Sequence, residues 1–140
     1  MPPISLGLGP VVMYPPNTKV KNFFNKIGTS IEIKNEKLSN NFWAISGTMA
    51  AFYEILKILS DWLVKKKIKR EKSQEYITSL YFALAGLALE NSKKNLKKFV
   101  ADSQTPGGLN WQGVNQLRKA GYYKALQNSL NSLLKRLNNS

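Results

Sequence analysis

One stretch near the middle of the chain carries two apolar stripes on a single predicted helix. The first stripe steps by 4, 3, 4, 3 and 4 residues and comprises Ile45, Met49, Phe52, Leu56, Leu59 and Leu63. The second comprises Ala51, Ile55, Ile58 and Trp62. A helix that is apolar on two sides must be enclosed, and a chain of 140 residues has few elements with which to enclose it. We therefore expect a second copy of the chain to cover this helix, giving a homodimer.

The helical pattern begins at about residue 41 and continues to the end of the chain. A second long helix is predicted over about 71–92, where alanines and a glycine between the leucines let another backbone approach closely. A Pro-Gly-Gly turn precedes a helix that Asn110 is expected to cap, and Gly121 separates that helix from the last one. The sequence thus predicts a mainly α fold, with a helical bundle over 41–140.

Residues 1–40 are patterned differently. A short strand is predicted over Val11–Tyr14, followed by a helix that Asn17 caps and Gly28 ends, and Thr29–Ile33 alternates like a second strand. Two strands are marginal on their own. We therefore expect this strand, helix and strand to pair with more sheet that lies outside the fragment.

The composition excludes several kinds of chemistry. The sequence has no cysteine and no histidine, which removes the thiolate nucleophile, the imidazole base and the usual zinc ligands, so no metal site is expected. The longest unbroken run of apolar and small residues, Leu80–Leu89, is about half of a membrane span. We expect no transmembrane segment. We also expect a cytoplasmic location, because no secretion signal opens the chain.

The net charge of +13 raises the question of a polyanionic partner. The densest basic cluster, Lys65 to Lys72, falls where two helices are predicted to meet. Only Arg70, Arg118 and Arg136 among the basic residues are arginines, the residue type that reads base edges with two hydrogen bonds. We therefore expect no nucleic-acid partner.

Two short segments have the composition of an anion site. Ser46-Gly47-Thr48 stands at the predicted start of the long helix, where a hydroxyl either caps the helix or joins its free amides around an anion. Thr105-Pro106-Gly107-Gly108-Leu109-Asn110 is a turn leading into a helix, and its two glycines are expected to expose backbone N–H groups to a carboxylate or phosphate. Gly7-Leu8-Gly9 is not counted as a dinucleotide fingerprint, because a proline and a strand follow it.

These two segments resemble those of the pyrroline-5-carboxylate reductases and their close relatives. In that family a Ser-Gly-Ser-Gly-Pro-Ala segment starts a long helix, and a Ser- or Thr-Pro-Gly-Gly-x-Thr turn precedes a later one. Ser46, Gly47 and Ala51 match the first segment, with Thr48 a conservative replacement, and Thr105–Gly108 match the second.

The start of the chain is also similar to that family. Met1-Pro2 resembles the beginning of the family's Met-Pro-Asn segment, and Val11–Ile33 resembles the last strand, helix and strand of its cofactor-binding domain. The resemblance implies that residues 1–40 are the C-terminal remnant of a dinucleotide-binding domain. Residues 41–140 are then the helical dimerisation and substrate-binding domain.

The resemblance also implies a function in proline biosynthesis. NAD or NADP would be bound mainly by a domain outside this chain, and hydride would pass to a cyclic imine or related carboxylate-bearing substrate. The chain has no cofactor-binding residues of its own on this reading, so we expect it to be inactive alone. The helical part would form an interleaved homodimer.

Site residues follow from the same resemblance. Gly107, Gly108 and Asn110 would bind the substrate carboxylate, Thr105 and Pro106 would shape the turn, and no residue is assigned a catalytic role. The set is completed by two polar groups of the first segment, Ser46 and Thr48.

Three positions depart from the family's pattern. Asn110 stands where the family has Thr, Pro3 where it has Asn, and Met49-Ala50 where it has Gly-Pro. The last replacement places a bulky side chain on the substrate side, which leaves a related imine or keto substrate open.

Two functions of other classes also remain open: a non-catalytic helical homodimer that serves as a scaffold, and a basic binder of nucleic acid or anionic membrane.

Overall fold

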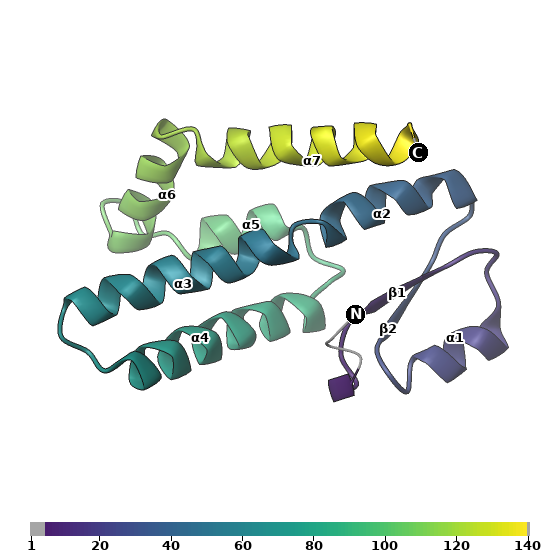
Figure 1. Cartoon of the computed structure of the whole chain (residues 1–140), viewed down its shortest axis with the longest axis horizontal. Helices are drawn as coiled ribbons and strands as arrows, with labels where there is room; N and C mark the ends of the chain where they lie inside the picture. The colour runs from purple at the N-terminus through teal and green to yellow at the C-terminus, as the bar shows by residue number, and fades with distance from the viewer. Residues whose placement is uncertain (1–4, 140) are drawn as a thin grey trace. The chain divides into compact units, whose positions relative to one another are not determined.

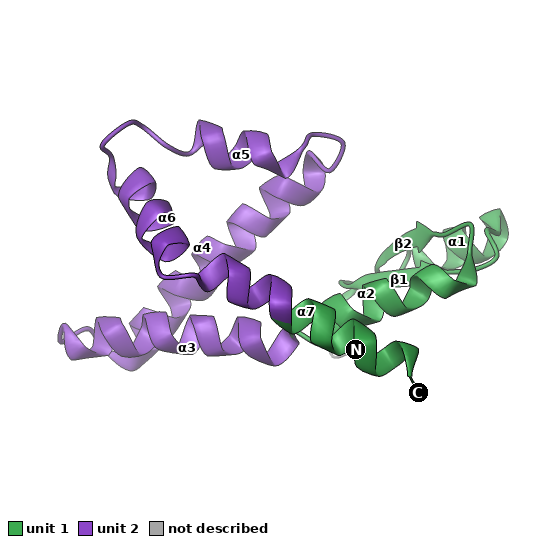
Figure 2. Cartoon of the chain, turned by 90° about the horizontal axis from the view of Figure 1, so that it is seen from above, with its two compact units in different colours: residues 1–48, 129–140 green, residues 49–128 purple. Residues whose placement is uncertain are grey.

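The computed structural model describes residues 5–139 and forms two compact units (Figure 2). Unit 1 comprises Met1–Thr48 and Ser129–Ser140, and unit 2 comprises Met49–Asn128. The Met1-Pro2 segment and Pro3 lie outside the described residues. The predicted division of the chain after residue 40 stays a prediction, because the compact units describe packing within the chain and not its relation to a larger protein.

Unit 1 begins with the predicted strand, helix and strand. Strand β1 (Pro10–Met13), helix α1 (Thr18–Phe24) and strand β2 (Thr29–Glu32) follow one another, and the two strands pair in parallel with Pro10 opposite Thr29. Parallel strands need a crossover connection, which α1 supplies. The mainly α fold with this short α/β segment at its start is therefore confirmed.

Local hydrogen bonds explain where α1 begins and ends. The Asn17 side chain accepts from the Val20 N–H at 3.1 Å, which confirms its predicted role as the helix cap. The helix ends at Phe24, one turn earlier than the apolar spacing predicts. Asn25 caps that end and also accepts from the Ser30 N–H at 3.0 Å, so it links the helix to β2.

The rest of unit 1 is helical. A 3-10 turn η2 (Glu36–Leu38) leads into α2 (Ser39–Ser46), beside which lies the C-terminal part of α7 (Tyr122–Asn138) (Figure 1). The Asn40 amide donates to the Leu137 carbonyl at 3.4 Å and to the Asn138 side chain at 3.0 Å. The end of the chain is thus fixed to a segment near its beginning.

Unit 2 is built on an antiparallel helix pair, α3 (Met49–Lys65) and α4 (Arg70–Glu90) (Figure 1). The turn between them uses Lys67 at a φ of 70°, and Arg70 donates to Asp61 across it at 2.8 Å. Beyond α4 the unit contains α5 (Leu96–Asp102), α6 (Leu109–Lys119) and the first part of α7.

One prediction about the helices is wrong, and one helix was not predicted separately. The stretch predicted as one helix from Ile45 onward is broken at Gly47-Thr48, so Ile45 belongs to α2 and the remaining apolar stripe to α3. Helix α5 follows the lysines Lys93 and Lys94 and precedes the Pro-Gly-Gly turn, in a stretch for which the sequence predicted no separate helix. Its N-terminal cap, Asn95, accepts from the Lys97 N–H at 2.8 Å and favours a helix that hydrophobic spacing alone does not show.

The helical stretch Glu36–Lys65 is long and apolar enough to cross a membrane by length and composition, although a core helix of a soluble protein passes the same test. The break at Gly47-Thr48 divides it into helices of 8 and 17 residues, each shorter than the roughly 20 residues of a span. The absence of a membrane span stays a prediction.

Few apolar side chains are buried by the described residues of one chain. The buried ones are Met13, Ile33, Ala44 and Ile77. On the second predicted stripe, Ile58 and Trp62 remain 57% and 58% exposed. The apolar helices therefore have no enclosing layer among residues 5–139.

A close backbone approach in unit 1 yields a stability prediction. A Cβ at Gly28 would collide with the Gly9 carbonyl oxygen, whereas a Cβ at Gly113 in α6 would meet nothing within 4 Å. We expect Gly28→Ala to lower the free energy of unfolding by about 1–3 kcal/mol. Gly113→Ala is the control and should leave it unchanged or raise it by up to about 1 kcal/mol. Denaturant unfolding followed by circular dichroism measures both, and equal effects would contradict the packing described.

The ion pair at the α3–α4 turn yields a prediction about pH. The Arg70 guanidinium, and more weakly Lys57, hold the pKa of Asp61 below its ordinary value of 3.8 against the opposing effect of desolvation. A carboxyl whose pKa is lowered by folding stabilises the folded state above its ordinary pKa, and this contribution is lost as pH falls through the folded value. The melting temperatures of the native chain and Asp61→Asn should therefore converge below about pH 3.8. A constant difference down to strong acid would contradict this.

Candidate functional site

The turn before α6 needs both of its glycines. The Gly108 N–H donates to the Thr105 carbonyl at 2.8 Å, which closes the turn. Gly107 has a φ of 74°, a conformation that side-chain-bearing residues rarely adopt. A Cβ at Gly108 would lie 3.0 Å from the Thr105 carbonyl oxygen. Gly107 is thus required for its backbone conformation and Gly108 for space.

The free N–H groups of this turn are those of Gly107 and of the first residues of α6. Gly108 is the N-terminal cap of α6 and provides no side-chain acceptor, and its own N–H is used inside the turn. Within the described residues, the N–H groups of Leu109, Asn110 and Trp111 have no acceptor. A helix start with unpaired donors carries partial positive charge and favours an anion. The expected exposure of the Gly108 N–H is therefore wrong, but the turn still offers a set of donors.

Asn110 lies inside α6 and does not cap it. Its side-chain amide donates to the Ser103 carbonyl at 3.0 Å, just beyond the end of α5. This contact corrects the expectation that Asn110 begins the helix, because the preceding Gly108 already occupies the cap position. The contact fixes the end of α5 to the start of α6 and so holds the turn between them.

The Ser46-Gly47-Thr48 segment ends one helix and does not cap the next. The Ser46 hydroxyl donates to the Phe42 carbonyl at 3.3 Å, and the Thr48 hydroxyl donates to the Ile45 carbonyl at 2.7 Å. Both hydroxyls therefore satisfy carbonyls of α2, and the predicted cap of the long helix is wrong. Their oxygens keep lone pairs that can accept a hydrogen bond.

Gly47 lies against the C-terminal part of α7. A Cβ at Gly47 would stand 3.2 Å from the Ala44 carbonyl oxygen and 3.2 Å from Leu133 Cδ1. A larger residue would push α7 away from α2, so the glycine has a packing role in unit 1. This reason for a glycine could not be found from the sequence, because Leu133 is distant along the chain.

The predicted site residues fall into two groups. Ser46 and Thr48 lie in unit 1, whereas Thr105, Gly107, Gly108 and Asn110 lie in unit 2. Within unit 2 the last four residues form one local structure through the contacts described above. That both groups face one substrate stays a prediction.

Unit 1 contains an opening that the sequence analysis missed. It has a volume of about 450 Å³ and is lined by Val12, Tyr14, Glu36, Lys37, Ser39, Asn40 and Trp43. It lies at the carboxyl end of β1, where open α/β sheets bind ligands. Two aromatic side chains, Tyr14 and Trp43, remain about half exposed there. In the sequence, the only indication of this opening was Tyr14, an aromatic residue directly after the strand.

The glycine fingerprint of a dinucleotide site and the side-chain cluster of a metal site are both missing from the described residues. Gly7 and Gly9 adopt positive φ values, but strand β1 follows them, so they do not open a helix toward a pyrophosphate. Between β1 and α1, where a fingerprint would stand, no described residue is a glycine. No group of three or more acidic, histidine or cysteine residues is placed to hold a metal within residues 5–139.

Comparison with protein families identifies the family of this chain. Residues 36–139 match the family described as pyrroline-5-carboxylate reductase dimerisation. The chain belongs to this family. A search of curated proteins gives no significant match. The predicted resemblance is thus confirmed at the level of the family.

Solved structures show the same fold. A pyrroline carboxylate reductase of Plasmodium falciparum, solved with NADP bound, has 23% identity and a TM-score of 0.75, over 96% of this chain and 56% of its own. The Coxiella burnetii enzyme has 18% identity and a TM-score of 0.78, over 96% and 52%. That of Streptococcus pyogenes has 18% identity and a TM-score of 0.77, over 96% and 54%. The chain thus spans about half the length of each reductase.

The contact between Asn110 and Ser103 yields a prediction. Asn110→Ala should lower the free energy of unfolding by about 1 kcal/mol, because it removes a hydrogen bond between two helices. Asn128→Ala is the matched control, since Asn128 is an exposed helical asparagine in the same unit. The measurement is denaturant unfolding of both variants. A loss no larger than that of the control would show that Asn110 does not hold the turn.

Proposed function

We propose that this chain is the dimerisation and substrate-binding part of a pyrroline-5-carboxylate reductase-like enzyme. In this proposal, a nicotinamide cofactor bound mainly by another domain transfers hydride to a cyclic imine or a related carboxylate-bearing substrate. The chain contributes the position of the substrate and the charge that complements its carboxylate. The proposal also places the protein in the cytoplasm and in proline biosynthesis.

The turn Thr105–Gly108 is the observation that carries this proposal. Its left-handed Gly107 and the start of α6 present N–H groups without acceptors in the described part of the chain. Such donors suit a carboxylate. Asn110 holds the turn in place and keeps a second amide hydrogen for the substrate. The Ser46 and Thr48 hydroxyls belong to the proposed substrate-binding set.

A homodimer accounts for the exposed apolar helices. Phe82, Leu84 and Leu87 of α4 remain more than half exposed in a single chain. We therefore propose that two copies cover each other's α3 and α4.

A charge placed on α4 tests the dimer. Leu84→Glu should weaken dimerisation by about 100-fold or more, because the charge would be buried at the interface. Leu84 is 55% exposed, so its replacement does not disturb the core of one chain. Leu6→Glu is the control, since Leu6 is also exposed and lies outside the family match. Sedimentation velocity over a range of concentrations measures both, and a folded monomer in the native chain would overturn the dimer.

A binding experiment tests the substrate site. Titration with pyrroline-5-carboxylate should shift the amide resonances of Leu109 and Asn110, and Gly107→Ala should weaken this binding by about 10-fold. Gly113→Ala, in the middle of α6, is the control and should bind pyrroline-5-carboxylate as the native chain does. A dimer whose amide resonances do not respond would favour the alternative of a non-catalytic scaffold.

A further inference from the structure

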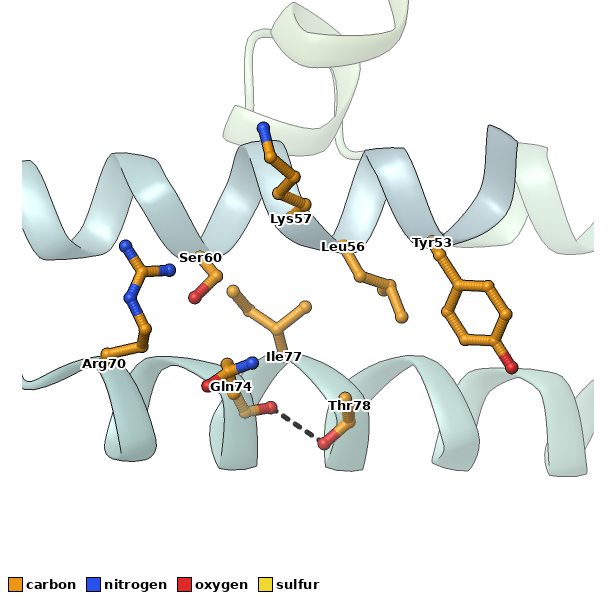
Figure 3. A pocket seen from close by; sticks show the side chains of 8 residues that line it. All are labelled: Tyr53, Leu56, Lys57, Ser60, Arg70, Gln74, Ile77 and Thr78. Carbon is orange, nitrogen blue, oxygen red and sulfur yellow. Dashed lines mark hydrogen bonds between the residues drawn. The ribbon is translucent and has the colours of Figure 1, made fainter. Parts of the chain in front are cut away.

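A second pocket lies between α3 and α4, entirely within unit 2 (Figure 3). Its volume is about 220 Å³, and it is lined by Tyr53, Leu56, Lys57, Ser60, Arg70, Gln74, Ile77 and Thr78. Leu56 and Ile77 form apolar walls between the two helices, and the Tyr53 ring stands at one end (Figure 3). Cavities of about 150 Å³ hold a benzene-sized molecule. The pocket therefore has room for a branched or cyclic carbon group with one polar end.

Ser60 gives the pocket an unsatisfied polar atom. The residue is 3% exposed, and its Oγ is buried without a hydrogen-bond partner in the described part of the chain. Ser73, which is fully buried on α4, instead donates to the Lys69 carbonyl at 3.0 Å. In Figure 3 the Ser60 side chain points from α3 toward α4, into the pocket. A buried hydroxyl without a partner destabilises the folded chain, because it has lost its hydrogen bonds to water. A ligand acceptor that enters the pocket therefore forms a hydrogen bond with Ser60 without displacing another partner of this hydroxyl.

Further hydrogen-bond donors lie around Ser60. Arg70 uses one nitrogen, Nη1, for Asp61 at 2.8 Å, and its remaining N–H groups have no acceptor within residues 5–139. The Gln74 side-chain amide is likewise unpaired in the described chain. The Thr78 hydroxyl already donates to the backbone carbonyl of Gln74 at 2.8 Å. The Ser60 hydroxyl, the Arg70 guanidinium and the Gln74 amide can therefore all donate at this end of the pocket. The complementary ligand group is an oxygen acceptor, and a carboxylate fits the guanidinium best.

We propose that this pocket binds a small monocarboxylate with a branched or cyclic apolar body. The carboxylate accepts hydrogen bonds from Ser60 and Arg70, and the carbon body packs on Leu56 and Ile77. The site is separate from the Gly107 turn and does not depend on the proposed reductase function.

Titration with isovalerate, a branched monocarboxylate, tests this pocket in the full chain. Isovalerate should produce saturable shifts in the amide resonances of Ser60 and Ile77. Acetate lacks the apolar body and isoamyl alcohol lacks the charge, so each should bind about 10-fold more weakly. Shifts confined to Leu109 and Asn110 would locate carboxylate binding at the Gly107 turn and overturn the proposal.

Two serine variants complete the test. Ser60→Ala should weaken isovalerate binding by about 3- to 10-fold, while its melting temperature stays the same or rises because an unsatisfied hydroxyl has been removed. Ser132→Ala removes an exposed helical hydroxyl of α7 and should leave the binding unchanged. Equal binding by all three proteins, or no saturable shift in the native chain, would overturn the proposal. If Ser60→Ala changes dimer affinity but not isovalerate affinity, a side chain of a second copy fills the pocket, and the proposal is wrong.

Discussion

The main constraint on this chain is that its helices carry more apolar surface than the chain can bury. Helices α3 and α4 pack on each other along one line, where Ser60, Ser73 and Ile77 are buried. The opposite sides remain apolar and exposed. Because burial of apolar surface is the main favourable contribution to folding, these sides determine what else the protein must contact. Dimerisation, the feature for which its family is described, meets that requirement.

Three neighbouring residues determine the local structure around the Pro-Gly-Gly turn, each in a different way. Gly107 supplies the backbone conformation, Gly108 supplies space and the helix cap, and Asn110 fixes the turn to Ser103. These roles depend on backbone conformation, on steric space and on a side-chain hydrogen bond, respectively, so replacing each residue would disturb the turn in a different way. The free N–H groups at the start of α6 result from all three.

Short-range patterns in the sequence predicted much of the fold. The Asn17 cap, the two strands and the break at Gly121 depend on residues within a few positions of one another, and the structure has each of them. The break at Gly47 and the role of Asn110 were not predictable in this way. Gly47 is constrained by Leu133 of another helix, and the Asn110 side chain bonds to a carbonyl beyond its own helix. That the Ser60 hydroxyl finds no partner among residues 5–139 likewise depends on how two helices pack.

Unit 1 is assembled from two segments that are far apart in the sequence, since Asn40 bonds to Leu137 and Asn138. Contacts so distant along the chain form late, because the intervening loop must close first. Because the chain is synthesised from its N-terminus, all of unit 2 is made before the residues of α7 that complete unit 1. The first strands and α2 therefore lack their contacts with Leu137 and Asn138 until this part of α7 has been added.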